Sequence, residues 1–417
     1  MVLVSGPCNL SCSPAKIRAK MLLIQAKEVL LLMRKIICLT GILLLLAALP
    51  LPAQIGKLVP IKAGTAEDRA VTEINAATDP AQQLTLIDKF AADFGTGDMA
   101  IVANDLYVNH YIAAQNYTKA FEYGAKLWAL DPDSFSNGVN MLRAAAAVGE
   151  EAKLFDYGDK IGAILQRFQA KPAPAGATAP EWAEQKDMAL AGIHDNLDWV
   201  EHTLFLASYN KKDPSGRAAA LLRFVGNFPA SSLAAQAQEI AAASYRQAQQ
   251  TAKMIEVANK LLEKDPDNRA MLLLFADYYS EKGEQLDKAA ANATRVVELT
   301  AKAVKPEGMT DEQWAQQIQL DKGLALSALG QVNIQKKDNA KAAENFQAAA
   351  PLLKSNPEMY ARNQYRLAFA LLNLHKTAEG KAVLEELAAT AGPFQSLAQQ
   401  KLKSLAAASG RAPAKKR

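Results

Sequence analysis

The sequence feature that most constrains the fold is an internal repeat with a period of 34 residues. The segment 121–127 reads Phe-Glu-Tyr-Gly-Ala-Lys-Leu and the segment 155–161 reads Phe-Asp-Tyr-Gly-Asp-Lys-Ile, so Phe, Tyr, Gly and Lys recur at one offset. A further copy lies at 256–262, and the copies at 121–127 and 256–262 are both followed by an Asp-Pro-Asp triplet. A fixed period of this length predicts a stack of small units, each of which buries its apolar stripe only against its neighbours.

The composition indicates that these units are helical. Half of the residues are hydrophobic but only 7% are aromatic, and the excess consists of Ala, Leu, Lys, Glu and Gln, which are strong helix formers. No stretch alternates Val, Ile and Thr as a strand would, and 22 Gly and 18 Pro among 417 residues are too few for a collagenous or disordered chain. We therefore exclude a β-sandwich, a βαβ enzyme fold and a wholly disordered protein.

The spacing and the residue pattern resemble the tetratricopeptide repeat (TPR). In the first copy Tyr111 takes the aromatic position of the first helix, 116–120 makes the tight turn, and 131–133 ends the unit. Ala120 and Gly124 lie one helical turn apart, where two helices must approach closely. The resemblance implies an all-α fold, a right-handed α-solenoid of helix hairpins, and it identifies a scaffold, which does not fix a function.

Further copies follow, and they divide the chain. The fourth includes Phe275 and Tyr279, the fifth has Gly330 and Phe346, and the sixth spans about 361–390. We predict a leader at 1–53, a helical region with repeats 1 and 2 at 57–168, a Pro/Ala-rich insert with degenerate hairpins at 169–234, repeats 3 and 4 at 235–300, an insert loop at 301–313, repeats 5 and 6 with a capping helix at 314–405, and a basic disordered tail at 406–417.

The two halves of the chain share an insert after their second repeat. Thr178 is followed three residues later by Glu181, and Thr310 by Gln313, which is the capping-box pattern that starts a helix. Trp182 and Trp314 stand just inside these helices, 132 residues apart. This pattern indicates an internal duplication. Either the tryptophans pack each insert back on the solenoid, or the two loops contact a partner.

Residues 1–53 have the features of an export signal. From Met33 the chain reads Met-Arg-Lys, then an apolar run at 36–49, then Pro-Leu-Pro-Ala, with Ala53 at a plausible cleavage point. The 14-residue run is shorter than the roughly 20 residues that span a bilayer. We expect translation to start at Met33, and a cleaved, exported protein that is periplasmic or otherwise extracytoplasmic, with no stable membrane insertion.

The excess of basic over acidic residues in the chain lies in the leader and the tail. The whole sequence carries 47 Lys and Arg against 43 Asp and Glu, a net charge of +4. Residues 1–53 hold six of the cations and one of the anions, so removing them leaves 41 against 42, a net charge of −1. The basic surface of a nucleic-acid binder is therefore not expected. All three cysteines precede residue 54, which excludes thiol chemistry and disulfides after cleavage.

Few residues of the sequence are candidates for metal binding or catalysis. His194, Asp198 and His202 would share one helix face and are the only candidate metal ligands, but positions i and i+8 lie about 12 Å apart along the axis. The alternative to a metal site is that these three residues simply form a polar or partly buried face of the helix. No phosphate loop, nucleophile elbow or dinucleotide motif occurs. We predict no enzymatic activity, no cofactor and no metal.

The resemblance places the binding surface on the first helix of each repeat, at positions 2, 5, 6, 9, 12 and 13. Family members that clamp a peptide carboxylate use Lys at position 5 and Asn at position 9 of one repeat, then Asn at position 6 of the next. Asn109 and Asn140 match the two asparagines of this pattern, but Asp105 stands at position 5, where the pattern has Lys. The predicted partner-binding residues are Asn109, Asn140, Arg143, Arg362, Tyr365 and Arg366.

The last three of these residues would suit an acidic or extended peptide. We expect an exported, non-catalytic TPR-type scaffold that binds protein or extended peptide partners in the bacterial cell envelope. The alternative is an envelope solute- or glycan-binding protein with a metal site or weak catalytic activity. The oligomeric state stays open.

Overall fold

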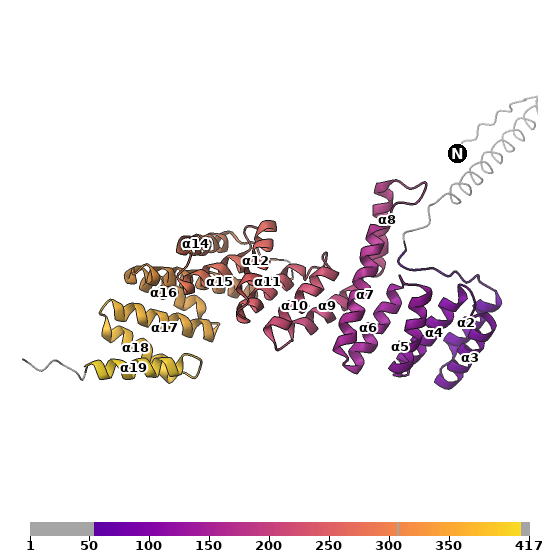
Figure 1. Ribbon diagram of the computed structural model, residues 1–417, viewed down its shortest axis with the longest axis horizontal. Coiled ribbons are helices and arrows are strands. Elements are labelled where there is room, and N and C mark those ends of the chain that lie inside the picture. The colour runs from indigo at the N-terminus through magenta and orange to yellow at the C-terminus, as the bar shows by residue number, and fades with distance from the viewer. Residues whose placement is uncertain (1–53, 307, 410–417) are drawn as a thin grey trace, which may run out of the picture. The chain divides into compact units, whose positions relative to one another are not determined.

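A computed structural model describes residues 54–306 and 308–409, and these residues form helices without a single strand (Figure 1). The predicted leader at 1–53 and most of the basic tail lie outside the described residues. The helices are α2 (Ala66–Ala76), α3 (Pro80–Phe94), α4 (Met99–Ala113), α5 (Tyr117–Leu130), α6 (Phe135–Val148), α7 (Glu151–Ala170), α8 (Ala179–Gly192), α9 (His194–Tyr209), α10 (Pro214–Asn227), α11 (Ala234–Gln247), α12 (Thr251–Lys264), α13 (Arg269–Lys282), α14 (Leu286–Lys302), α15 (Asp311–Gln335), α16 (Asn339–Leu353), α17 (Pro357–Asn373), α18 (Thr377–Ala389) and α19 (Gln395–Ser409).

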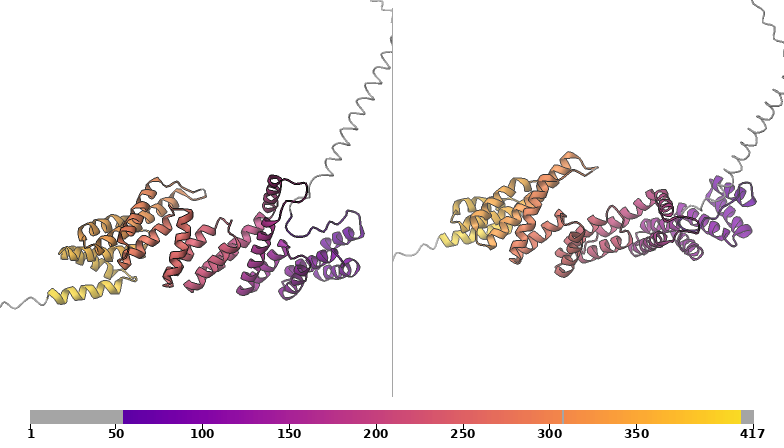
Figure 2. Two further views of the ribbon diagram at one scale, coloured as in Figure 1. Left: turned by 45° about the horizontal axis from the view of Figure 1, so that its top comes forward. Right: turned by 90° about the horizontal axis from the view of Figure 1, so that it is seen from above.

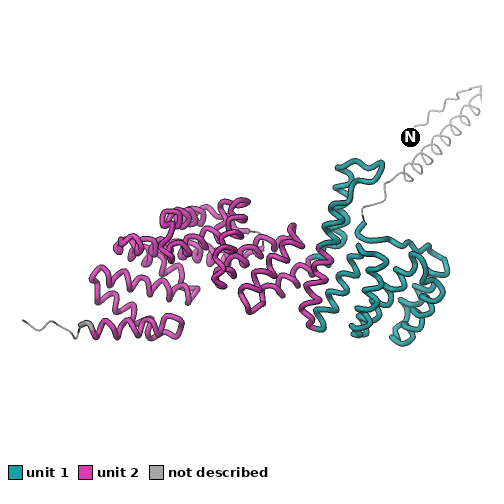
Figure 3. The backbone as a smooth tube through the Cα atoms, in the orientation of Figure 1, with its two compact units in different colours: residues 1–148, 163–197 teal, residues 149–162, 198–417 magenta. Residues whose placement is uncertain are grey.

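The chain divides into two compact units, which are coloured separately in Figure 3. Unit 1 runs to residue 148 and includes 163–197, whereas unit 2 consists of 149–162 and the chain from 198 onwards. Helices α7 and α9 contribute residues to both units. None of the helices in the described part of the chain is long and apolar enough to cross a membrane.

Within each unit the helices pack as hairpins on one another, which confirms the predicted all-α fold of stacked helix pairs. In unit 1, α2 contacts α3, α3 contacts α4, and α4 contacts α5. In unit 2 the contacts run from α10 through α19, each helix touching the next. Figure 2 shows the helices from two further sides. The segment before the first predicted repeat forms a further pair, α2–α3. The degenerate hairpins predicted at 169–234 include α9 and α10, which meet where the rings of Phe205 and Phe224 lie 6.0 Å apart.

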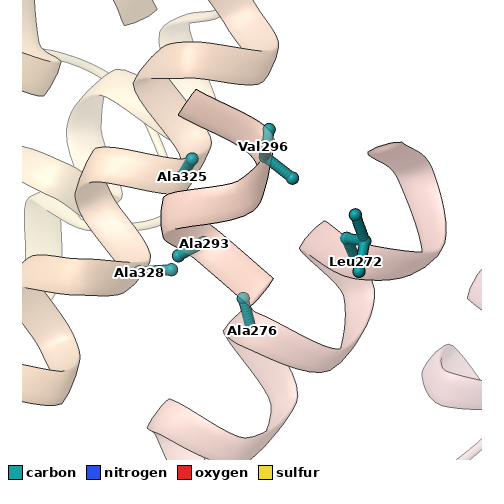
Figure 4. Close-up of a cluster of buried hydrophobic side chains, with 6 residues drawn as sticks. All are labelled: Leu272, Ala276, Ala293, Val296, Ala325 and Ala328. Atoms are coloured by element: carbon teal, nitrogen blue, oxygen red, sulfur yellow. The ribbon is translucent and has the colours of Figure 1, made fainter. Parts of the chain in front are cut away.

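Small residues set the distance between the helices of unit 2. A buried cluster joins α13, α14 and α15 through Leu272, Ala276, Ala293, Val296, Ala325 and Ala328 (Figure 4). Four of these six side chains are alanines, so the helix backbones lie close together. Gly330 shows the same requirement, because a Cβ atom there would lie 2.5 Å from the ring of Phe346. The glycine of the fifth copy is thus explained by packing.

The inserts begin as the sequence predicts. Thr178 and Thr310 each form a complete capping box at the start of α8 and α15. Trp182 Nε1 donates a hydrogen bond of 2.9 Å to the carbonyl oxygen of Lys171. The guanidinium of Arg269 lies 5.3 Å from the centre of the Trp314 ring. Trp314 therefore packs its helix against α13, whereas the bond from Trp182 ties α8 to the chain just after the end of α7. The two inserts differ in one respect: α15 continues as a single helix of 25 residues, whereas α8 ends at Gly192 before α9 begins.

Candidate functional site

The first helices of four hairpins in unit 2 line one pocket. Helices α11, α13, α15 and α17 lie in succession, α11 against α13, α13 against α15, and α15 against α17. They enclose a cavity of about 300 Å³. Its lining, which we call the groove pocket, consists of Glu239, Ala243, Arg246, Ala270, Met271, Leu273, Leu274, Asp277, Leu324, Met359 and Arg362.

The helical period explains which side chains reach this pocket. On α13, Leu272 and Ala276 face the core that α14 and α15 complete. Leu273 and Asp277, four residues apart and next to that apolar stripe, line the groove pocket, and Leu273 also packs against the core cluster. Leu324 and Met359 are only partly buried there. The pocket therefore has an apolar floor in which Met271 and Leu274 are buried and Leu273, Leu324 and Met359 stay partly exposed.

Five charged side chains from three of these helices form an ionic cluster, which we define as Arg246, Asp277, Glu281, Arg362 and Arg366. Arg246 of α11 lies 2.8 Å from Asp277 and 2.7 Å from Glu281, both on α13. Arg362 of α17 lies 2.9 Å from Asp277 and 3.3 Å from Glu281. Arg366 lies 2.9 Å from Glu281 and 3.7 Å from Asp277. The cluster therefore joins α13 to α17 past the intervening α15.

The cluster keeps its charges although it is largely withdrawn from water. Burial acts to raise the pKa of Asp277, but the guanidinium groups of Arg362, Arg246 and Arg366 outweigh it, and the pKa of this carboxyl is lowered. Burial, together with the neighbouring Arg362, lowers the pKa of Arg366 from its usual high value. The Asp277 and Arg366 side chains are only 17% and 12% exposed. Such pairs need one another, because removing one partner leaves a buried charge uncompensated.

The structure separates the three residues that the sequence grouped on α17. Arg362 and Arg366 belong to the ionic cluster, so their charge is compensated within the chain. Tyr365 packs instead against α18 and α19, with its ring 5.7 Å from that of Phe394. The expected set of two cations and an aromatic ring facing one ligand is therefore not assembled in one place.

The predicted residues of unit 1 do come together. Asn140 of α6 donates a hydrogen bond of 3.0 Å to Asn109 Oδ1 on α4, and Asn109 donates one of 3.0 Å to Asp105. Burial raises the pKa of Asp105 despite the bond from Asn109. Arg143 donates a bond of 2.8 Å to Asn196 Oδ1. These side chains share one polar face, and the hydrogen bonds between them use several of their donors.

The candidate metal ligands all lie on α9, but they do not converge on one point. His202 Nδ1 lies 3.0 Å from the backbone carbonyl oxygen of Asp198, a contact within the helix. Residues 54–306 and 308–409 contain no group of three or more His, Cys, Asp and Glu that could hold a metal ion.

Sequence reasoning missed the acidic half of the ionic cluster. Asp277 and Glu281 stand four residues apart on α13, and their partner Arg362 lies 85 residues from Asp277. Their place on the first helix of a hairpin, on the face that the resemblance assigns to binding, is the signal that could have found them. Arg246 has the same signal on α11.

No protein-family model matches the sequence, and no curated protein matches it. Among solved structures, a chain of the APC/C hetero-tetramer Cut9-Hcn1 aligns over 78% of this chain and 87% of its own, with 14% identity and a TM-score of 0.24. Yeast Tom70 aligns over 83% and 95%, with 14% identity and a TM-score of 0.23. The P58(IPK) TPR domain aligns over 84% and 100%, with 12% identity and a TM-score of 0.24. Alignments with TM-scores this low do not define a fold, and the fold follows from the chain's own helix contacts.

Proposed function

We propose that this protein is a non-catalytic scaffold that binds a segment of a protein partner in the groove pocket. The observation that carries this proposal is the apolar floor of that pocket, where Leu324 and Met359 stay partly exposed between converging helices. Apolar side chains that a chain leaves uncovered in a concave site are typical of ligand sites, and a groove between helices suits a peptide or a helix.

The polar face of unit 1 supports a second contact with the same class of partner. Asn109, Asn140 and Arg143 present amide and guanidinium groups on neighbouring first helices. Amides of this kind can exchange hydrogen bonds with a peptide backbone. We rank this polar face below the groove pocket as a binding site, because Asn109, Asn140 and Arg143 already donate hydrogen bonds within the chain.

The location in the cell envelope is a proposal that rests on the sequence alone. A basic start at Met33, an apolar run and a small residue at Ala53 support export. Mass spectrometry of the protein isolated from its native cells should find Gln54 as the first residue. A mature chain that still carries residues before 54 would contradict cleavage there.

Variants of the groove floor test the binding site. We expect Leu324→Glu and Met359→Glu to abolish capture of the protein's partners from native extracts, because a carboxylate in an apolar pocket is desolvated at high cost. Val304→Glu is the matched control, since Val304 is 86% exposed and lies outside the groove pocket. Circular dichroism would verify that all three variants fold. Unchanged capture by both groove variants would contradict the site.

The same extracts separate this scaffold from its rival, an envelope solute- or glycan-binding protein. A scaffold should retain protein partners in stoichiometric amount, as quantified by mass spectrometry. Thermal stabilisation by a metal ion or a glycan, with no protein retained, would favour the rival instead.

A further inference from the structure

The charges around the groove pocket balance one another. The ionic cluster holds three guanidinium groups and two carboxylates. Glu239, which also lines the pocket, supplies a third carboxylate. Its Oε1 atom accepts a hydrogen bond of 2.7 Å from Asn268, which fixes it near the start of α13. The charged side chains that line the pocket itself are Glu239, Asp277, Arg246 and Arg362, two carboxylates and two guanidinium groups, so its rim offers no net charge to a ligand.

The two carboxylates of α13 already accept hydrogen bonds from the arginine side chains that an acidic ligand would have to bind. Asp277 accepts from both Nη atoms of Arg362, at 3.1 and 2.9 Å. Glu281 accepts from Arg362 and Arg366 at 3.3 and 2.9 Å. Arg366 Nη1 makes no hydrogen bond, but it lies buried 3.7 Å from Asp277. An incoming carboxylate would have to displace a built-in carboxylate that is already desolvated.

We propose, as a refinement of the function proposed above, that the groove pocket accepts an uncharged apolar segment and that Asp277 and Glu281 reject acidic ones. The ligand is the apolar face of a partner helix or a short extended run of aliphatic side chains. Specificity of this kind combines an attractive floor with a repulsive rim. The cavity, at about 300 Å³, has room for a few side chains of such a segment.

Two features make this ligand fit better than an acidic peptide. The floor contains five large apolar side chains, Met271, Leu273, Leu274, Leu324 and Met359. An acidic ligand would find the arginines already paired with Asp277 and Glu281, and it would meet the carboxylates of Asp277 and Glu239 in the pocket lining. A like charge placed beside these carboxylates costs free energy in a half-buried site.

A selection from random 12-residue peptides displayed on phage tests this inference with a defined probe. The bait is the whole chain, used once as wild type and once as the Asp277→Asn, Glu281→Gln double variant. For wild type we expect enrichment of Leu, Met, Ile and Phe and depletion of Asp and Glu. The double variant leaves three arginines facing Glu239 alone, so acidic peptides should become at least tenfold more frequent.

Binding of the selected peptides to Leu324→Glu separates the two proposals. Acidic peptides that bind wild type and lose binding in Leu324→Glu would overturn the inference and leave the groove as a peptide site. If the selected peptides, whatever their composition, still bind Leu324→Glu, the groove pocket is not the binding site. A selection that yields no binder would contradict that site as well. If the double variant does not fold, Glu281→Gln alone replaces it, since the Glu281 side chain is 39% exposed. An unchanged acidic fraction with either folded variant would also overturn the inference.

Discussion

Asn363 of α17 donates a hydrogen bond of 2.8 Å from its Nδ2 atom to the backbone carbonyl oxygen of Phe346 in α16, and both side chains are fully buried. Asn137 of α6 makes the equivalent bond, at 2.9 Å, to the carbonyl oxygen of Gly124 in α5. In each case the first helix of a hairpin is tied to the second helix of the hairpin before it. A buried amide thus fixes how successive hairpins stack.

We expect Asn363→Ala to lower the free energy of unfolding by about 1–3 kcal/mol, because it removes a buried hydrogen bond and leaves a cavity. The matched control is Asn373→Ala, also on α17, whose amide bonds to Asn339 at the surface. That change should cost less than about 0.5 kcal/mol. Urea denaturation followed by circular dichroism measures both, and equal losses would contradict the role of Asn363.

The turn between α11 and α12 offers a stabilising substitution. Gln249 has a φ of +58°, in the left-handed region, and Gln115, Lys337 and His375 have the same conformation in the corresponding turns. Because glycine adopts this conformation without a Cβ penalty, Gln249→Gly should stabilise the fold by about 1 kcal/mol. Lys260→Gly, inside α12, should destabilise it by a similar amount. Thermal melts of the two variants should move in opposite directions.

Gly330 is the position where an added methyl group should be most harmful in unit 2. A Cβ atom there would lie 2.5, 2.7 and 2.9 Å from ring atoms of Phe346, which is fully buried and cannot swing away. Gly330→Ala should therefore cost about 1–3 kcal/mol, despite the better helix propensity of alanine. Gly192→Ala, which meets no atom within 4 Å, is the control and should be neutral. A stable Gly330→Ala variant would contradict the close packing of α15 on α16.

The ionic cluster should make stability sensitive to acid. The folded pKa of Asp277 lies below its ordinary value, because the arginines outweigh the effect of burial. Its contribution is therefore complete above an unfolded pKa of about 3.9, and it is lost as the pH falls from there through the folded pKa. The melting temperature of wild type should fall more between pH 6 and pH 3 than that of Asp277→Asn, which lacks this carboxyl. Parallel pH curves for the two proteins would contradict this assignment.

Much of the fold was predictable because it depends on local, periodic signals. The 34-residue spacing identified the pairs α4–α5 and α6–α7, and the capping boxes at Thr178 and Thr310 marked the starts of α8 and α15. The segment of α2–α3 was predicted to be helical but was not assigned to a repeat, and α9–α10 falls within the degenerate hairpins predicted at 169–234. Their turns differ from those of the clear copies: Asp79 and Asp213 cap a helix that begins with proline, and neither turn contains a left-handed residue.

The candidate site was less predictable, because its contacts are not periodic. The first-helix positions correctly brought Asn109 next to Asn140. The pairing of Arg362 with Asp277 depends on how far α13 and α17 are brought together around α15, which is a property of the stack and not of any single repeat. Tyr365 differs from its neighbours for a rotational reason, since one residue around a helix turns a side chain by about 100°. That rotation directs Tyr365 toward α18 and α19.

The ionic cluster also affects how this stack can come apart. Where every hairpin touches only its neighbours, the array can fray from an end one hairpin at a time. Here Arg362 and Arg366 tie α17 to α13, two hairpins further into the chain. Loss of α17–α18 would leave the largely buried Asp277 and the more exposed Glu281 of α13 short of cations, so fraying from the C-terminal side must disrupt an interior hairpin at the same step. The four hairpins from α11 to α18 should therefore melt together as one cooperative block.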